Sequence, residues 1–346
     1  MFVVEQLEDS RYYSDLFGHL ESQNIEVWFY NLANFKFNPD ILGERTILNK
    51  SSRYYFSIFN LNSICKKFDI IHAHESIPSF YTSIAIRLLK KHPKFIFHWH
   101  HAKSIGWKQY IMDKCAVNLA DRVVFVSKSM KKLNESRFKA KVIKFSVIYN
   151  GMDVASCELG NKTAFDICLI GRLRPEKGFV FILDVLHKVI RKHKALKVRL
   201  YGSGPQEQLL KTKIEELGLS DNIKMQGHVY NPLPYLCTSK ILVVPSFSEP
   251  FGLVAIEGMG TGAAVIASRV GGLKEIIQDN VNGVLVKPND FDGFYRAIIN
   301  LLENPNHREK LAEKAKETFI ELYSIKQMAD KYSKLYQELK YGSRKS

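Results

Sequence analysis

The chain has 346 residues, of which 46% are hydrophobic and 25% are charged, which excludes a disordered or fibrous protein and is ample for two globular domains. Lys and Arg outnumber Asp and Glu by 50 to 35, and residues 1–150 hold 22 of the former against 13 of the latter. The net charge of +15 indicates an anionic partner: a phosphate-bearing substrate, anionic lipid headgroups or nucleic acid.

Short apolar runs alternate with helical patterns along the whole chain. Stretches such as 78–92 and 178–193 have apolar residues at helical spacing. Strands that alternate with helices form parallel sheets covered on both faces, and twelve are too many for one open sheet. We therefore predict an α/β protein of two doubly wound, Rossmann-like domains. The predicted strands are 1–6, 25–30, 68–74, 95–100, 121–127 and 147–153, then 165–172, 197–204, 222–228, 241–247, 264–268 and 283–286.

The domain boundary is predicted in the small, polar stretch 153–163, directly before a new strand. This gives an N-terminal domain over 1–155 and a C-terminal domain over 163–325. From residue 290 onward the chain turns helical and charged, and residues 326–341 are expected to form a helix that crosses back to the N-terminal domain.

Cysteine usage and apolar runs indicate the compartment. No apolar run approaches the roughly 18 residues that span a bilayer, so we expect no transmembrane helix. The five cysteines are scattered, odd in number and without a CxxC pair. This favours reduced thiols and predicts a cytoplasmic protein.

Three glycine-containing turns follow predicted strands of the second domain, where open parallel sheets bind ligands. The first, GRLRPEKG, runs from Gly171 to Gly178 and carries Arg172 and Lys177 before a helix start, a suitable place for phosphate. The second contains Gly202 and Gly204, which let the backbone approach a ligand but lack the third glycine of a dinucleotide fingerprint. The third is the glycine pair in SRVGG, which closes the same crevice.

The stretch SFSEPFGLVAIEGMGTG, residues 246–262, places two glutamates eight positions apart among apolar residues and glycines. Pro250 suits a first helical turn, so a helix is expected to start near Gly252 with Glu249 at its mouth and Glu257 two turns in. The free N–H groups of Gly252 and Leu253 suit a phosphate. Ionised carboxylates accept hydrogen bonds, so the natural partners of both glutamates are sugar hydroxyls.

Taken together, these motifs resemble the donor half of retaining GT4 glycosyltransferases of the GT-B fold, and NLADRVVFVSKSM and VIYNGMD are typical of that family's first half. The resemblance runs from about residue 68 to the C-terminus. It implies a central cleft between an acceptor-binding N-terminal domain and a nucleotide-sugar-binding C-terminal domain.

The resemblance also implies roles for single residues. Arg172 and Lys177 grip the donor diphosphate, Glu249 binds the donor sugar and faces its anomeric carbon, and Glu257 binds the ribose. Transfer proceeds without a metal or other cofactor, through a covalent intermediate on Glu249 or a same-face transfer assisted by the leaving phosphate. The remaining donor contacts implied are the backbone N–H groups of Phe251, Gly252 and Leu253, the turn glycines Gly171, Gly202 and Gly204, and His228 and Val229 against the base.

Histidines dominate the first half's candidate site. The family keeps a histidine after the fourth strand, for which FHWHHAKS offers His100 first and His101 next. A metal site made of His72, His74, His98, His100 and His101 is disfavoured, because no carboxylate cluster accompanies them. The loop after the first strand lacks the family's glycines, so acceptor contacts are expected through side chains there: Glu5, Asp9, Tyr12 and Tyr13.

The sequence thus predicts a retaining glycosyltransferase that moves a hexose-type sugar from a UDP- or GDP-linked donor to a glycan or lipid-linked acceptor. The pathway expected is synthesis of cell-surface polysaccharide, lipopolysaccharide or glycolipid, with peripheral contact to the inner face of an anionic membrane. A glycogen-synthase-like or phosphorylase-like enzyme is the alternative. A nucleic-acid-binding protein is disfavoured, because no helix-turn-helix, RRM or KH pattern is present.

Overall fold

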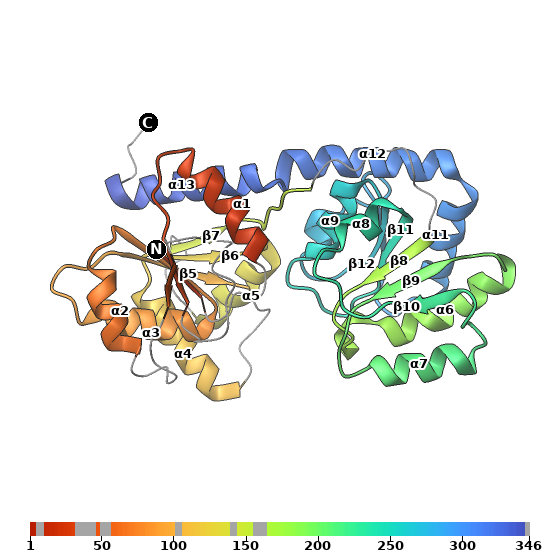
Figure 1. Cartoon of the computed structure of the whole chain (residues 1–346), viewed down its shortest axis with the longest axis horizontal. Coiled ribbons are helices and arrows are strands. Elements are labelled where there is room, and N and C mark those ends of the chain that lie inside the picture. Colours follow the sequence, from red (N-terminus) through yellow and green to blue (C-terminus); the bar gives the residue numbers. More distant parts are fainter. Residues whose placement is uncertain are drawn as a thin grey trace. The chain divides into compact units, whose positions relative to one another are not determined.

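The computed structural model of the chain describes residues 1–4, 10–31, 46–48, 57–100, 106–138, 144–154 and 165–342. It divides into two compact units, Met1–Asp153 with Ile325–Ser346 and Val154–Ser324. Each unit contains one parallel sheet with helices packed around it (Figure 1). The predicted class, two doubly wound α/β domains, is confirmed.

The first unit is built on a seven-stranded sheet in the order β3-β2-β1-β4-β5-β6-β7. The chain runs outward from β1 to β3 and then returns to the other side of β1 with β4, so β1 and β4 flank the topological switch point. The strands are β1 (Phe2–Val4), β2 (Phe29–Asn31), β3 (Thr46–Leu48), β4 (Ile70–His74), β5 (Lys94–Trp99), β6 (Arg122–Phe125) and β7 (Phe145–Val147). The helices between them are α1 (Ser10–Glu21), α2 (Ser57–Cys65), α3 (Ser76–Arg87), α4 (Gly106–Leu119) and α5 (Lys128–Phe138).

The last helix, α13 (Ile325–Tyr341), belongs to this first unit although it is last in the chain. Its buried residues recur every three or four positions, which places them on one face. That face shares a core with α1 and with strands β1, β5 and β6. Residues of α13 in this core include Met328, Tyr332, Leu335, Tyr336 and Leu339.

The second unit has a six-stranded sheet in the order β10-β9-β8-β11-β12-β13. Its switch point lies between β8 and β11, so a ligand crevice is expected beyond the carboxyl ends of these two strands. The strands are β8 (Phe165–Ile170), β9 (Val198–Tyr201), β10 (Ile223–Met225), β11 (Ser239–Val244), β12 (Ala264–Ser268) and β13 (Val284–Val286). The helices are α6 (Phe179–Lys192), α7 (Glu207–Glu216), α8 (Leu233–Cys237), α9 (Leu253–Thr261), α10 (Leu273–Ile276), α11 (Phe291–Glu303) and α12 (Pro305–Leu322).

Several expectations fail in the described part of the chain. The strand predicted over 147–153 is β7 at Phe145–Val147, so it ends where it was expected to begin. The strand β3 was not predicted, because a run of three residues carries too little pattern. Cys237 is disulfide-bonded, whereas Cys65, Cys115 and Cys168 are free thiols, so the prediction of reduced cysteines holds for three and is wrong for Cys237. None of the described helices is both long and apolar enough to cross a membrane.

Candidate active site

The loop after β8 is fastened to the end of β11 by backbone contacts. Residues Pro175–Lys177 form a single turn of 3-10 helix, and Gly178, with φ 71°, is the N-cap of α6. A Cβ at Gly178 would overlap the carbonyl oxygen of Pro245, so only glycine allows this approach. The amide of Phe247 donates to the carbonyl of Glu176 at 2.8 Å. This loop is therefore held at the switch point by the main chain itself.

Lys177 and Glu249 meet where these two loops join. The Lys177 Nζ lies 2.6 Å from the Glu249 Oε2, and both side chains are largely buried, with exposed fractions of 18% and 12%. The hydroxyl of the buried Ser246 donates to the same Oε2 at 3.3 Å. The ion pair offsets the cost of burying each charge, and it holds a carboxylate and an ammonium group side by side at the carboxyl ends of the strands.

The backbone of Glu249 is fixed from its other side by the loop after β12. The amide of Gly272 donates to the carbonyl oxygen of Glu249 at 3.0 Å. A Cβ at Gly271, with φ 43°, would overlap that carbonyl, and one at Gly272 would overlap the carbonyl of Phe251. The glycine pair therefore packs against the Glu249 loop and sets the position of Glu249.

The glycines after β9 have a different neighbour from the one expected. A Cβ at Gly202 would overlap the carbonyl oxygen of Gly171, and one at Gly204 would lie 2.6 Å from the carbonyl oxygen of Leu173. The amide of Leu173 donates to the carbonyl of Ser203 at 2.9 Å. These glycines therefore allow the loop after β9 to pack closely against the loop after β8.

Helix α9 starts near Gly252, as the sequence predicts, but Pro250 does not lie in its first turn. Its N-cap is Gly252, with φ 119°, so Pro250 precedes the helix and Glu257 lies little more than one turn in, not two. Gly252 in this left-handed region breaks the helical geometry that Pro250 alone would have permitted. The first amides of α9 point out of the helix end beside the Glu249 loop, as an anion-binding helix start requires.

The other predicted donor residues lie on loops or in the first turns of α9, at the same edge of the second sheet. Arg172, next to Gly171, is exposed, as are Leu253 and His228, whereas Val229 is partly buried and Phe251 is buried. The loop that contains His228 is tied in by the amide of Gly202, which donates to the carbonyl of Gly227 at 2.7 Å. Glu257 is partly buried on α9.

The predicted histidine of the first unit directly follows β5. His100 lies with its Nε2 at 3.0 Å from the Nδ1 of His74, at the end of β4. The second candidate histidine, His101, falls outside the described residues. So do Glu5 and Asp9 and the side chains of Tyr12 and Tyr13, which were predicted to contact the acceptor.

Sequence reasoning missed two kinds of partner. Ser246 was not singled out, although its place at the carboxyl end of β11, within the stretch that holds Glu249, was the available signal. Tyr332 and Tyr336 were also missed; their hydroxyls lie 3.0 Å from the Nδ1 of His98 and 2.7 Å from the Nδ1 of His72. Their spacing of four on an apolar helix face was visible, but their partners 234 and 264 residues away were not.

Comparison with known proteins identifies the family. Residues 158–318 match the family described as glycosyl transferases group 1, and residues 10–156 match glycosyltransferase family 4. The chain is 30% identical to an uncharacterized glycosyltransferase of Methanocaldococcus jannaschii over 78% of this chain and 76% of that protein. It is 24% identical to glycogen synthase of Mycobacterium tuberculosis over 80% of this chain and 70% of that protein. It is also 31% identical to a lipopolysaccharide core biosynthesis glycosyltransferase of Rhizobium meliloti, over 50% of this chain and 49% of that protein.

Solved structures agree on the fold. The sucrose-phosphate synthase of Thermosynechococcus elongatus superposes with a TM-score of 0.81 at 20% identity, covering 98% of both chains. The Anabaena protein HepE, solved in complex with UDP-glucose, has a TM-score of 0.81 at 18% identity over 97% of this chain and 99% of that one.

Proposed function

The chain belongs to the GT4-type glycosyltransferases and has the GT-B fold, and from this premise we propose that it is a retaining enzyme that transfers a hexose-type sugar from a nucleoside diphosphate. The observation that carries the proposal is the Lys177–Glu249 pair at 2.6 Å, held by three loops at the switch point of the second sheet. A pair fixed by backbone contacts is already in place before the substrate arrives, which is the arrangement that stabilises developing charge most effectively.

The donor would interact with this site through its two chemical halves. Lys177, with Arg172 and the start of α9, supplies positive potential for the leaving diphosphate. Glu249 accepts from the sugar hydroxyls, and Glu257, one turn into α9, accepts from the ribose. On arrival of the donor, Lys177 exchanges part of its contact with Glu249 for phosphate oxygens, which frees a lone pair of the carboxylate for the sugar.

A screen of nucleotides tests the donor class. UDP, GDP, ADP and their sugars are added to the purified chain, and the melting temperature is measured, because a ligand that binds only the folded state stabilises it by mass action. We expect a UDP- or GDP-linked sugar to raise the melting temperature of the wild type and to leave Lys177→Ala unchanged. Stabilisation by none of them contradicts the proposal.

The stereochemistry and the metal requirement are tested on turnover. We propose transfer with retention at the anomeric carbon and with no divalent ion at the donor site, because Lys177, Arg172 and the helix start supply the charge that a metal would supply. Proton NMR of the product formed without added Mg²⁺ or Mn²⁺ should show the donor's anomeric configuration. An inverted product, or transfer that needs either ion, contradicts this assignment.

The acceptor we propose is lipid-linked or membrane-borne glycan, reached from the cytoplasmic face of the membrane in the synthesis of surface polysaccharide, lipopolysaccharide or glycolipid. On α4, Trp107 and Ile111 lie one turn apart with exposed fractions of 70% and 53%. Lys108 and Lys114 flank them and are exposed. Exposed apolar side chains beside lysines are typical of peripheral contact with anionic lipid.

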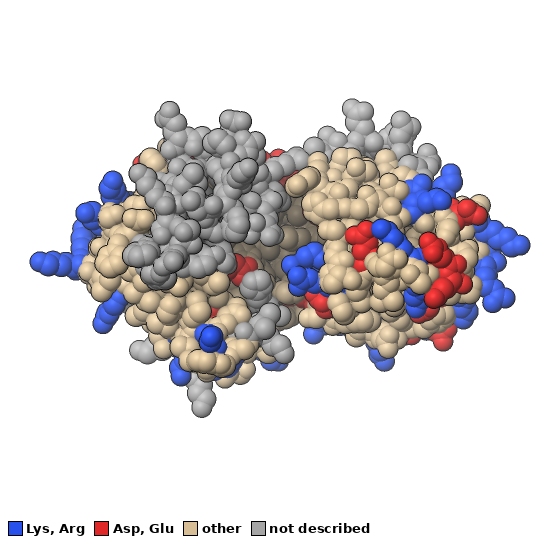
Figure 2. All heavy atoms as spheres, turned by 60° about the horizontal axis from the view of Figure 1, so that its bottom comes forward, with Lys and Arg blue, Asp and Glu red and all other residues tan. Residues whose placement is uncertain are grey.

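The surface charge is consistent with such contact. Figure 2 shows Lys and Arg along the left edge of the first unit, whereas acidic and basic side chains are interspersed over the visible face of the second. We expect the chain to sediment with vesicles of anionic phospholipid at low salt and Trp107→Ala to sediment less. Wild type that stays in the supernatant contradicts the membrane proposal and leaves the donor proposal intact.

The second candidate is a glycogen-synthase-like enzyme, favoured by the similarity to the mycobacterial glycogen synthase. The same nucleotide screen separates the two. Stabilisation by ADP-glucose, together with extension of a soluble glucan, would assign this second function.

A further inference from the structure

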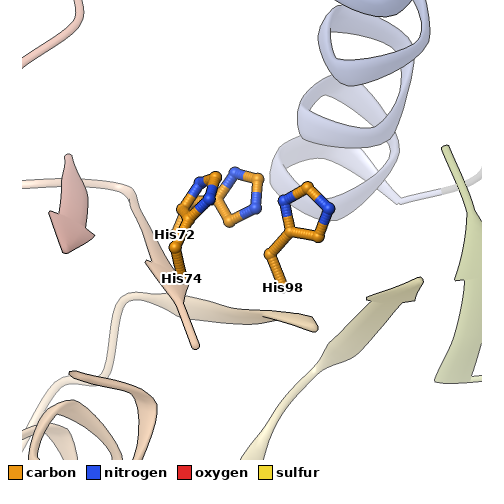
Figure 3. Close-up of side chains that lie close together, drawn as sticks. All are labelled: His72, His74 and His98. Atoms are coloured by element: carbon orange, nitrogen blue, oxygen red, sulfur yellow. The ribbon is translucent and has the colours of Figure 1, made fainter. Parts of the chain in front are cut away.

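A group of histidines lies in the interior of the first unit, apart from the charged loops of the second. His72 and His74 are on β4 and His98 is on β5, and their side chains have exposed fractions of 1%, 2% and 0%. Alternation along β4 puts His72 and His74 on one face, and the register of the two strands pairs His74 with His98. Figure 3 shows the three rings gathered on that face.

The nitrogens of these rings are close enough to share an ion. One ring nitrogen of each histidine lies within 4.8 Å of one from each of the others. Nitrogens bound to one tetrahedral Zn²⁺ at 2.0–2.1 Å are about 3.4 Å apart, so shifts of about 1 Å complete the site. The ring centroids of His72 and His98 are 4.6 Å and 4.7 Å from that of His74.

On two of these rings, His72 and His98, hydrogen bonds occupy the Nδ1 atom and leave the Nε2 atom available to bind an ion. The Nδ1 of His72 bonds to the hydroxyl of Tyr336, and the Nδ1 of His98 bonds to the hydroxyl of Tyr332, both from α13. The Nε2 atoms of His72 and His98 are buried and have no hydrogen-bond partner among the described residues. A histidine whose far nitrogen is fixed by a second group while the near nitrogen stays available is the usual arrangement around a protein-bound metal.

The three rings are also buried, and burial favours the neutral form of an imidazole. Burial, more than the neighbouring charges, holds the pKa of His72, of His74 and of His98 well below the ordinary value of 6.5. A neutral imidazole can donate a lone pair to a metal ion, and that lone pair is on Nε2 in the tautomer whose Nδ1 donates to the tyrosine.

Against the expectation from the sequence, which disfavoured a metal site here, we propose that His72, His74 and His98 form a binding site for a borderline divalent transition-metal ion, with Zn²⁺ as the ion expected. Three imidazoles suit Zn²⁺, Ni²⁺ and Cu²⁺ and do not suit Mg²⁺ or Ca²⁺, which take oxygen ligands. The fourth position falls to water or to His100, whose Nε2 already lies 3.0 Å from the Nδ1 of His74. His72 and Tyr336 also line a cavity of about 750 Å³.

The site would join three elements of the first unit. Its ligands come from β4 and β5, and the tyrosines that orient them come from α13. A bound ion would therefore stabilise the docking of α13 and would act in the fold and not in transfer.

The first experiment uses the full chain, purified with a tag that contains no histidine and stripped with a chelator. It is loaded with Zn²⁺, desalted and assayed for metal, and a parallel sample is titrated with Co²⁺ and followed by visible absorption. We expect one zinc per chain and the intense visible bands of tetrahedral Co²⁺. The proposal is overturned if the wild type does not retain stoichiometric zinc. It is also overturned if added Co²⁺ shows only the weak visible absorption of the octahedral aqua ion.

Variants then place the ion. His98→Gln should lower zinc affinity at least about 100-fold and Tyr332→Phe about 10-fold, since second-sphere partners are worth 10–100-fold. The exposed His92 provides the control: His92→Gln should bind as wild type does. Unchanged binding in His98→Gln overturns the site. Should His98→Gln fail to fold, X-ray absorption of the zinc-loaded wild type decides: three or four imidazole nitrogens support the site, and a shell of oxygens overturns it.

Discussion

The carboxyl ends of the central strands differ in chemistry between the two units. In the second unit, glycines let four loops touch through their backbones, and the side chains they present are charged, Lys177 and Glu249 above all. In the first unit, the side chains at β4 and β5 are neutral imidazoles, held by tyrosine hydroxyls and by ring packing. The difference teaches that the charged pair of the second unit is fixed by the main chain, whereas the buried histidine cluster of the first is fixed by its side-chain partners.

The largest effect is expected for Glu249→Ala. Removing this carboxylate deletes the group that we propose faces the sugar and leaves Lys177 largely buried without its partner, so transfer should fall by about 10³-fold. The measurement is kcat/KM with the best donor from the screen, with circular dichroism to verify the fold. The control is Glu303→Ala, which removes a carboxylate whose ion pair with Lys192 is exposed. Near-normal turnover of Glu249→Ala would remove this residue from the site.

A matched pair of glycines tests whether the backbone fixes the second unit's loops. Gly178 and Gly218 have nearly the same φ, 71° and 65°, but a Cβ at Gly178 overlaps the carbonyl of Pro245 and one at Gly218 meets nothing within 4 Å. Gly218→Ala should cost about 1 kcal/mol in unfolding free energy, the cost of the left-handed conformation alone. Gly178→Ala should cost about 3 kcal/mol or more, because strain and overpacking add to it. Equal losses in urea denaturation would contradict the close approach.

The histidine cluster of the first unit makes stability depend on pH. The pKa of His98 lies well below 6.5 in the folded state, because burial disfavours the charged ring. Below about pH 6.5, His98 is protonated in the unfolded chain but stays neutral in the folded chain. The free energy of unfolding therefore decreases as the pH falls below that value. In metal-free protein, His98→Gln should flatten the slope of unfolding free energy against pH by up to about 1.4 kcal/mol per pH unit. Identical slopes for variant and wild type between pH 5 and 6.5 would show that His98 titrates normally.

The smallest effect is expected for Tyr332→Phe. The variant keeps the ring in the core and removes the hydroxyl that bonds to the buried Nδ1 of His98, so it should cost about 1–2 kcal/mol. Tyr341→Phe is the control, since Tyr341 has an exposed fraction of 70% and should change stability by less than about 0.5 kcal/mol. A loss for Tyr332→Phe as small as that of the control would mean that the hydroxyl does not hold the histidine.

The sequence was informative wherever a local pattern determines a local structure. Strand–glycine–helix transitions at 170–178 and 244–253 predicted the loops of the second unit, because a parallel sheet needs such turns at its carboxyl edge. Glu257 was expected two turns into α9 and lies little more than one turn in, because Gly252 is the N-cap and Pro250 stays outside the helix. The tie of Gly202 to Gly171 could not be predicted either, since it joins two loops about 30 residues apart.

The histidines show the same limit at longer range. Alternation placed His98 and His100 on one face of a strand, and the structure agrees, with their ring centroids 4.1 Å apart. That His74 lies opposite His98 depends on strand register, and that tyrosines from α13 complete the cluster depends on the path of the whole chain. Neither can be obtained from the spacing of residues within a strand.

The place of α13 affects the order in which the protein can fold during synthesis. The second unit, Val154–Ser324, is one continuous segment and can close its core as soon as the ribosome releases it. The first unit needs Met328, Tyr332 and Leu335, which are made last. The N-terminal unit must therefore keep part of its core open while the C-terminal unit folds, which reverses the usual order of domain folding on the ribosome.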